Sequence, residues 1–142
     1  MITIEKLKVE DIPIIIELYK NFVPFETSLP QSLEKYEEIS RNENYFLAVA
    51  KEDGEVLGTA LGICCQTLTL PFLVIEDVIV KEGIRGKGIG RKLMDSLDEF
   101  AKQNNCAYAL LVSSGHLKGA HKFYERVGFT EHVEGFRKVY ID

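Results

Sequence analysis

The segment Ile75-Glu-Asp-Val-Ile-Val-Lys-Glu-Gly-Ile-Arg-Gly-Lys-Gly-Ile-Gly-Arg-Lys-Leu-Met94 decides the fold, because it runs an apolar strand through a glycine-rich loop into a helix. Glycines at such a junction let backbone N–H groups point at one spot without side chains in the way. The helix that begins there adds unpaired N–H groups and the positive end of its dipole. Arg85, Lys87 and Arg91 add full positive charges. The segment therefore predicts a binding site for a pyrophosphate or polyphosphate group.

The spacing of the loop glycines separates the possible phosphate ligands. A dinucleotide-binding fingerprint requires Gly-x-Gly-x-x-Gly, whereas Gly86, Gly88 and Gly90 place the third glycine one position early. A P-loop requires Ser or Thr after its Gly-Lys pair, and here Lys87 is followed by Gly88. The pattern therefore disfavours both of the common nucleotide-binding motifs.

Hydrophobic periodicity and turn residues divide the rest of the chain into short elements. The expected strands are Ile2 to Leu7, Tyr45 to Lys51, Glu55 to Gln66, Leu70 to Val80, Ala107 to Val112, Phe129 to His132 and Gly135 to Ile141. The expected helices are Asp11 to Phe22, Ser32 to about Arg41, Gly88 to Gln103 and Leu117 to Val127. Ser32 is the expected N-cap after a loop over Pro24 to Gln31, and Asp53-Gly54 predicts a hairpin. The order β-α-α-β-β-β-α-β-α-β-β predicts an α/β (α+β) fold.

Composition limits the class of protein. A chain of 142 residues with 46% hydrophobic and 27% charged residues predicts one globular domain over residues 1–142. The net charge of −5 argues against nucleic acid and acidic membranes as partners, since both select basic surfaces. It suits an anionic cofactor held at one basic loop, or a cationic acceptor such as an amine.

Cysteine usage and apolar runs bear on localisation. Cys64 and Cys65 are adjacent and so point to opposite faces of a strand, and with Cys106 they match no zinc pattern. We therefore expect reduced, structural thiols. No signal peptide is visible at the N-terminus, and no apolar run approaches the length of a membrane span. A cytoplasmic protein without a metal site is the prediction.

A second motif follows downstream, in Ala120-His-Lys-Phe-Tyr-Glu-Arg-Val-Gly-Phe129. A purely structural interpretation is available, with Phe123, Val127 and Phe129 in the core and Gly128 ending the helix. The pair of motifs, in this order, resembles the GNAT superfamily of N-acetyltransferases. The resemblance covers about residues 45–136, and it implies the GNAT fold, with a mixed, mostly antiparallel central sheet of six to seven strands and about four helices.

The resemblance implies acetyl-coenzyme A as the donor substrate. Its pantetheine arm is expected along Val78 to Val80, where a backbone N–H, that of Ile79, would polarise the thioester oxygen. Its pyrophosphate is expected on the loop. Many relatives carry a cofactor-binding asparagine where this chain has Leu117, so Ser114 or His116 is a possible substitute. The expected cofactor-binding residues are Val78, Ile79, Val80, Arg85, Gly86, Lys87, Gly88, Ile89, Gly90, Ser114 and His121.

The resemblance also implies catalytic residues. Tyr124 matches the tyrosine that often protonates the departing coenzyme A thiolate. Glu76 is the favoured base and Asp77 the competitor, because adjacent strand residues face opposite sides unless a bulge re-aims one of them. Structural roles for both carboxylates remain an alternative.

The acceptor is expected to be a primary amine of a small molecule. The candidate substrate-binding residues are Phe25, Glu26, Thr27 and Phe136. The strand Ile75 to Val80 is locally similar to that of glucosamine-6-phosphate acetyltransferases. A protein or peptide amine acceptor, and a non-catalytic acyl-coenzyme A-binding regulatory domain, are the alternatives. A homodimer is a further expectation from the resemblance.

Overall fold

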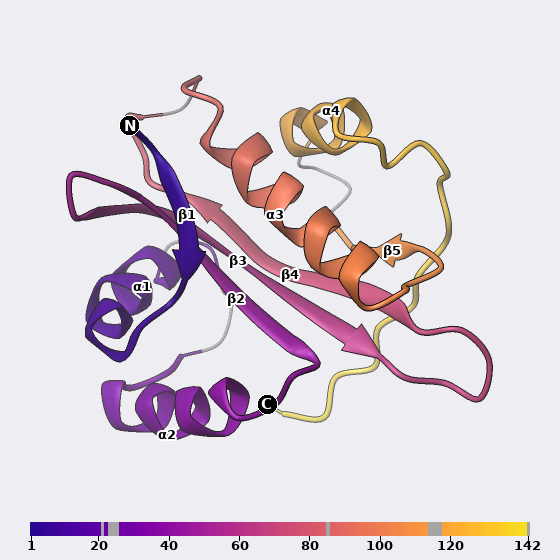
Figure 1. Ribbon diagram of the computed structural model, residues 1–142, viewed down its shortest axis with the longest axis horizontal. Helices are drawn as coiled ribbons and strands as arrows, with labels where there is room; N and C mark the ends of the chain where they lie inside the picture. The colour runs from indigo at the N-terminus through magenta and orange to yellow at the C-terminus, as the bar shows by residue number, and fades with distance from the viewer. Residues whose placement is uncertain (21, 23–25, 85, 114–117, 142) are drawn as a thin grey trace. The chain divides into compact units, whose positions relative to one another are not determined.

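The computed structural model describes residues 1–20, 22, 26–84, 86–113 and 118–141 (Figure 1). The chain divides into two compact units, Met1–Leu110 and Leu111–Asp142. The single domain expected over residues 1–142 therefore stays a prediction. Among the described residues, no helix combines the length and the apolar character needed to cross a membrane.

The first unit holds nearly all of the regular structure. Its strands are β1 (Thr3–Lys6), β2 (Tyr45–Glu52), β3 (Glu55–Cys65), β4 (Phe72–Val80) and β5 (Ala109–Leu110). Its helices are the 3-10 turn η1 (Val9–Asp11), α1 (Ile12–Tyr19), α2 (Leu29–Ser40) and α3 (Ile89–Gln103). The order of these elements is the one predicted from the sequence.

The five strands form one sheet in the order β1-β2-β3-β4-β5. The first four strands pair antiparallel, and β5 pairs parallel with β4. The turn between β2 and β3 is made by Asp53 and Gly54, which both have positive φ, as an Asn-Gly or Asp-Gly hairpin turn requires. The prediction of a mixed, mostly antiparallel sheet is confirmed, together with the hairpin.

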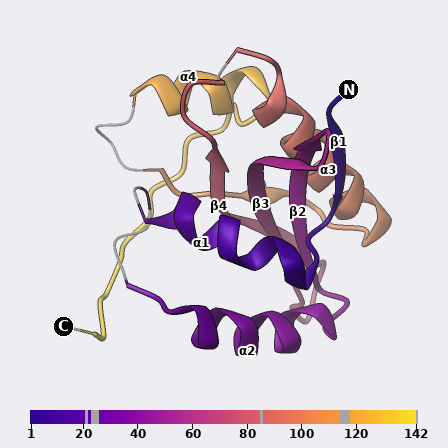
Figure 2. The same ribbon diagram turned by 90° about the vertical axis from the view of Figure 1, so that its left-hand side faces the viewer.

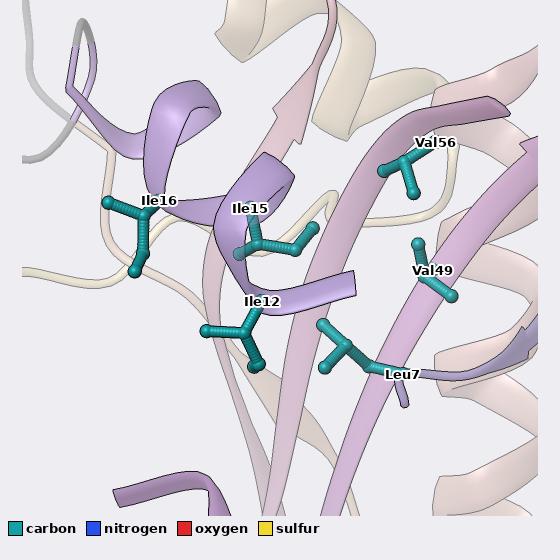
Figure 3. Packing of buried hydrophobic residues seen from close by; sticks show 6 residues of the cluster. All are labelled: Leu7, Ile12, Ile15, Ile16, Val49 and Val56. Atoms are coloured by element: carbon teal, nitrogen blue, oxygen red, sulfur yellow. The ribbon is translucent and has the colours of Figure 1, made fainter. Parts of the chain in front are cut away.

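Alternation along β2 and β3 gives the sheet two apolar faces. Helices α1 and α3 lie on opposite sides of the sheet (Figure 2). On one face, α1 packs its buried isoleucines against the strands. The residues of this cluster are Leu7, Ile12, Ile15, Ile16, Val49 and Val56 (Figure 3). Spacings of three and four residues put the isoleucines on one side of α1, and Pro13 is tolerated because it lies in the first turn.

Helix α3 packs on the opposite face through Ile89, Leu93 and Leu97, which are at most 2% exposed. The contact depends on Gly58 of β3. A Cβ atom at this position would lie 2.8 Å from the carbonyl oxygen of Ile79 and 3.3 Å from Cδ1 of Leu93. The absence of a side chain therefore lets the first turns of α3 lie close to the strands.

Helix α2 begins earlier than predicted. Its N-cap is Ser28, whose side-chain oxygen accepts a hydrogen bond from the backbone N–H of Gln31 at 3.3 Å. The Gln31 side chain accepts the Ser28 N–H in return, which completes a capping box. The prediction of Ser32 as the cap was wrong, because Pro30 was assigned to a loop although proline is favoured in the first turn of a helix.

The second unit contains α4 (Lys118–Arg126). The residues after it, 129–141, contain no strand, so the two strands predicted over 129–132 and 135–141 are not formed. Most of these side chains are exposed, and Phe136 is 96% exposed, so the segment has apolar residues but no buried face. The described sheet therefore has five strands rather than six to seven.

We predict that Ser28→Ala lowers the free energy of unfolding by about 1 kcal/mol, because it removes the side-chain partner of a helix N-terminal N–H. Urea denaturation would measure the change. Ser32→Ala is the matched control, since Ser32 is half-buried and its hydroxyl pairs with that of Thr27, at 3.1 Å, rather than with a helix N–H. A larger loss for Ser32→Ala than for Ser28→Ala would contradict the assignment of the cap.

Candidate active site

A β-bulge interrupts β4 in the middle of its pairing with β3. Leu61 pairs with Glu76 and Thr59 pairs with Ile79, so one β3 residue faces two residues of β4. These two residues are Asp77 and Val78, and Asp77 has φ of 52°. Bulges of this kind re-aim side chains and often lie beside active sites. A bulge at this point is the condition under which one of the two adjacent carboxylates can be redirected.

The bulge gives Glu76 and Asp77 different surroundings. The Glu76 side chain is exposed, whereas Asp77 is half-buried. Burial raises the pKa of the Asp77 carboxyl above its ordinary value, because the charged form is less well solvated. A carboxylate with a raised pKa is a stronger base, and carboxylates with such shifts occur often at catalytic sites.

Tyr19 of α1 is a neighbour of Asp77 that the sequence analysis did not identify. Burial raises the pKa of the Tyr19 hydroxyl, and the negative charge of Asp77 raises it further. Tyr19 therefore stays protonated at neutral pH, as a neutral hydroxyl within electrostatic range of the carboxylate. Helical spacing from Ile12 and Ile16 places Tyr19 on the buried side of α1, and this periodicity is the sequence signal for it.

The edge of β4 that faces β5 is open over most of its length. β5 pairs with β4 only at Leu73 and Val74. Within the part of the chain that the structure describes, no strand pairs with this edge from Ile75 to Val80. Unpaired N–H and C=O groups of a strand edge can bind an extended ligand as an added strand would.

The glycine-rich loop leads from β4 into α3. Gly88 is the N-cap of α3 with φ of 77°, a left-handed conformation that favours glycine. Apart from the adjoining residues, no atom of the described chain lies within 4 Å of a Cβ built on Gly86 or on Gly88, so the backbone here faces open space. Lys87 is exposed, and Ile89 is 2% exposed under the helix. Arg85 lies outside the described residues.

Lys81 and the positive charge of Lys87 lower the pKa of a nearby carboxyl group, that of Glu55. The pKa of Glu55 is lowered by its hydrogen bond with Lys81, of 2.6 Å, by the charge of Lys81 and by that of Lys87. The loop therefore combines exposed backbone, the N-terminus of α3 and a lysine, which are the components of an anion-binding site.

Tyr124 lies near the C-terminal end of α4 in the second unit. Its ring contacts Phe123 and Phe129 edge-on, with centroids 5.4 Å and 6.1 Å away. The Phe129 N–H donates to the Tyr124 carbonyl at 3.0 Å after the helix ends. Burial raises the pKa of the Tyr124 hydroxyl, so the group carries its proton at neutral pH. His121, three residues earlier, is half-buried.

The predicted acceptor residues are only partly described. Glu26 and Thr27 are exposed and directly precede α2, and Phe136 is exposed in the segment after α4. Phe25 and Ser114 lie outside the described residues, as do His116 and Leu117. Their contribution to a binding site stays a prediction.

A surface groove of about 840 Å³ lies elsewhere in the first unit. It is bordered by the end of β1, the start of β2, and the C-terminal halves of α2 and α3. Phe46 and Phe100, whose ring centroids are 5.4 Å apart, form part of its floor. None of the predicted site residues that the structure describes lines this groove, so it does not correspond to the candidate active site.

Comparison with known proteins finds similar sequences and a similar fold. The chain is 29% identical over 136 residues to an uncharacterized N-acetyltransferase of Bacillus subtilis (strain 168), covering 91% of this chain and 89% of that protein. It is 36% identical over 63 residues to the glucosamine 6-phosphate N-acetyltransferase of Trypanosoma brucei brucei, covering 44% and 41% of the two chains. It superimposes on a transcriptional regulator from Bacillus halodurans C-125 with a TM-score of 0.88 and 27% identity, covering 99% and 100%.

The family assignment rests on a wider match. Residues 12–129 match the acetyltransferase (GNAT) family. This span includes α1, the β4 bulge, the glycine-rich loop and Tyr124. The chain therefore belongs to the GNAT family of acetyl-coenzyme A-dependent N-acetyltransferases.

Proposed function

We propose that the protein transfers an acetyl group from acetyl-coenzyme A to a primary amine of a small molecule by direct attack. The observation that carries this proposal is the open edge of β4, which lies between the bulge at Asp77 and the loop at Gly88. Along β4 and into the loop that follows it, the chain presents three features in order. The first is a carboxylate, the second is backbone groups that no described strand pairs with on this edge, and the third is a loop suited to an anion. This is the order that an acyl donor with a terminal pyrophosphate and an attacking amine would need.

The donor would bind in two parts. Its pyrophosphate would lie at Gly86 to Gly90, where backbone N–H groups, the N-terminus of α3 and Lys87 are available. Its pantetheine arm would pair with the edge of β4 from Val78 to Val80. An N–H group of this edge, that of Ile79 in our proposal, would stabilise the oxyanion of the tetrahedral intermediate.

The base in this mechanism is Asp77 rather than Glu76. The attacking amine must lose a proton, because an ammonium ion has no lone pair with which to form the C–N bond. Asp77 is half-buried with a raised pKa, whereas Glu76 is exposed. The sequence analysis favoured Glu76, and the different burial of the two side chains is our reason for exchanging their roles.

Tyr124 completes the reaction as the general acid. When the C–S bond of the tetrahedral intermediate breaks, the electron pair stays on sulfur and the thiolate takes a proton from the tyrosine hydroxyl. Burial supports this role, since it keeps Tyr124 protonated at the pH of the reaction. Solvent then takes the proton from the base and supplies one to the Tyr124 oxygen, which restores both groups.

A regulatory domain that binds acyl-coenzyme A without catalysis is the second candidate. The similarity to a protein described as a transcriptional regulator, at a TM-score of 0.88, supports this alternative. The first candidate is preferred because a sensor needs neither a base nor an acid. The local similarity to a glucosamine 6-phosphate N-acetyltransferase makes amino sugars the first acceptors to test, followed by polyamines, aminophosphonates, amino acids and peptides.

We predict that thiol release from acetyl-coenzyme A depends on an added amine, and that Tyr124→Phe lowers kcat at least about tenfold with an unchanged Kd for coenzyme A. Turnover would be measured with a thiol reagent over the amine panel, and Kd by calorimetry. Tyr108→Phe is the matched control, since Tyr108 is 57% exposed and stacks on Phe72.

Two results would count against these assignments. Equal turnover of Tyr124→Phe and the parent protein would exclude the general-acid role. Tight coenzyme A binding without thiol release for any amine would favour the regulatory alternative over the enzyme.

We predict that Asp77→Asn lowers kcat/KM by about 100-fold or more, whereas Glu76→Gln changes it only a few-fold. Asparagine suits the φ of 52° at this position, so the substitution removes the charge without straining the backbone. Because burial raises the Asp77 pKa, the base gains its proton as pH falls through this raised value. The acid limb of the pH–rate profile should therefore lie above the ordinary carboxyl pKa of about 4.

The pH–rate profile distinguishes the two carboxylates. Glu76→Gln should keep the acid limb at the same pH, while residual activity of Asp77→Asn should lack it. If Glu76→Gln removes the limb and Asp77→Asn retains it, the base is Glu76.

We predict that Gly88→Ala weakens coenzyme A binding at least about tenfold, because the added Cβ strains a left-handed residue and occupies the open space beside the loop. Gly54→Ala is the matched control. Gly54 has φ of 80° and equally open surroundings, but it lies in the turn between β2 and β3. Both variants should lose similar stability on thermal unfolding, and only Gly88→Ala should lose affinity. Equal affinities would refute the loop assignment.

A further inference from the structure

Two cysteines that are 42 positions apart in the sequence meet inside the first unit. The Sγ atoms of Cys64 and Cys106 are 3.6 Å apart, which is van der Waals contact between two thiols. Cys64 is 3% exposed and Cys106 is half-buried. A disulfide bond is about 2.05 Å long, so the two sulfur atoms would have to approach by about 1.5 Å to form one.

The position of Cys64 is fixed by the sheet. It is close to the end of β3, where it pairs with Leu73 of β4. Its N–H donates to the carbonyl of Asn44 at 2.6 Å. Alternation from Gly58 along β3 directs its side chain to the face that α3 covers.

The position of Cys106 is fixed by the end of α3. Its N–H donates to the Ala101 carbonyl at 3.0 Å, and the Asn105 N–H donates to the Lys102 carbonyl at 3.2 Å. With Asn105 at φ of 57°, these two bonds form a Schellman motif. The Ala107 N–H then donates to the Pro71 carbonyl at 2.8 Å, which fastens the chain beyond the motif to the segment before β4. Regular structure therefore holds both sulfur-bearing residues.

We propose that Cys64 and Cys106 form a redox-active dithiol site, which exchanges with low-molecular-weight disulfides such as oxidised glutathione. The Cys106 thiolate attacks one sulfur of oxidised glutathione and releases one glutathione thiolate. The Cys64 thiolate then attacks the mixed disulfide at the Cys106 sulfur and releases the second. One protein disulfide and two molecules of glutathione replace two protein thiols and one glutathione disulfide.

Cys65 is the competing partner that the geometry disfavours. Its Sγ atom faces the carbonyl of Ile63 at 3.8 Å, and adjacent strand residues point to opposite faces of the sheet. The Sγ atom of Cys64, in contrast, accepts a hydrogen bond from Nε2 of Gln66 at 3.6 Å, and the Cys106 sulfur lies at the same distance from it. The contact between Cys64 and Cys106 is not predicted from the sequence, which predicts structural thiols at all three positions.

The surroundings make the exchange slow. Burial, and the neighbouring Cys64 thiol, raise the pKa of Cys106 to about 11. Only a small fraction of Cys106 is therefore the reactive thiolate at neutral pH. The site would respond to a sustained change in the thiol–disulfide balance rather than to a brief one.

The bond would close a loop that contains β4 and α3, the two elements that carry the candidate donor site. A disulfide across such a loop restricts the unfolded chain and so stabilises the native state. The proposal does not depend on acetyl transfer, because it concerns the packing of α3 on β3 alone.

The test uses Cys65→Ser, which leaves Cys64 and Cys106 as the only thiols. The full chain is equilibrated for days at pH 8 in reduced and oxidised glutathione, blocked with an alkylating reagent and weighed by mass spectrometry. We expect a product that has lost two hydrogen atoms and accepts no alkyl group. Its equilibrium constant of formation should be at least about tenfold larger in native protein than in urea-unfolded protein.

Two double variants complete the test, namely Cys64→Ser with Cys65→Ser, and Cys65→Ser with Cys106→Ser. Neither can form an internal bond, so each should give at most a mixed disulfide with glutathione. In the parent protein, fragment masses of the linked peptides should join Cys106 to Cys64. A link through Cys65, or an equilibrium constant that is no larger in the native protein than in urea, would overturn the proposal.

Discussion

The packing of α3 on the sheet determines where the glycine-rich loop lies and where Cys64 and Cys106 meet. Gly58 lets the helix approach β3, and Ile89, Leu93 and Leu97 fill the interface. Once this face is buried, the N-terminus of α3 must lie beside the end of β4, where the loop around Gly88 presents its backbone. The same packing carries the C-terminal end of α3 to the end of β3. One apolar interface thus fixes the glycine-rich loop proposed to bind pyrophosphate at one end and a pair of thiols at the other.

The bulge in β4 changes the direction in which side chains and backbone groups point, compared with a regular strand. In a regular strand, consecutive side chains alternate between the faces, and backbone groups alternate between the two edges. The extra residue at Asp77 gives two adjacent carboxylates different degrees of burial, and among the described residues the backbone after it pairs only with β3. Burial, rather than a neighbouring negative charge, then raises the pKa of the Asp77 carboxyl. The local backbone geometry thereby gives two neighbouring carboxylates different chemical properties.

Most features encoded by short stretches were predictable from the sequence, with the start of α2 as the exception, and those set by pairing between distant stretches were not. The Asp53-Gly54 turn and the start of α3 at Gly88 each depend on a backbone conformation that a few residue types adopt. The start of α2 was missed because Ser28 and Ser32 are both plausible caps, and only the Ser28–Gln31 hydrogen bonds distinguish them. The bulge depends on the register of two strands, and the Cys64–Cys106 contact on the folding of α3 over β3. Neither has a signal in local periodicity.

This distinction also explains why the donor is easier to infer than the acceptor. A pyrophosphate is bound largely by backbone N–H groups, and a backbone can approach it only where glycines occur, so the donor leaves a spacing of glycines in the sequence. An amine acceptor is selected by side chains on connecting segments, such as Glu26 and Thr27 before α2. Such side chains are ordinary exposed residues until a ligand brings them together. The acidic net charge of −5 favours a cationic acceptor over an anionic one, but the choice among amines depends on contacts that only a bound acceptor would reveal.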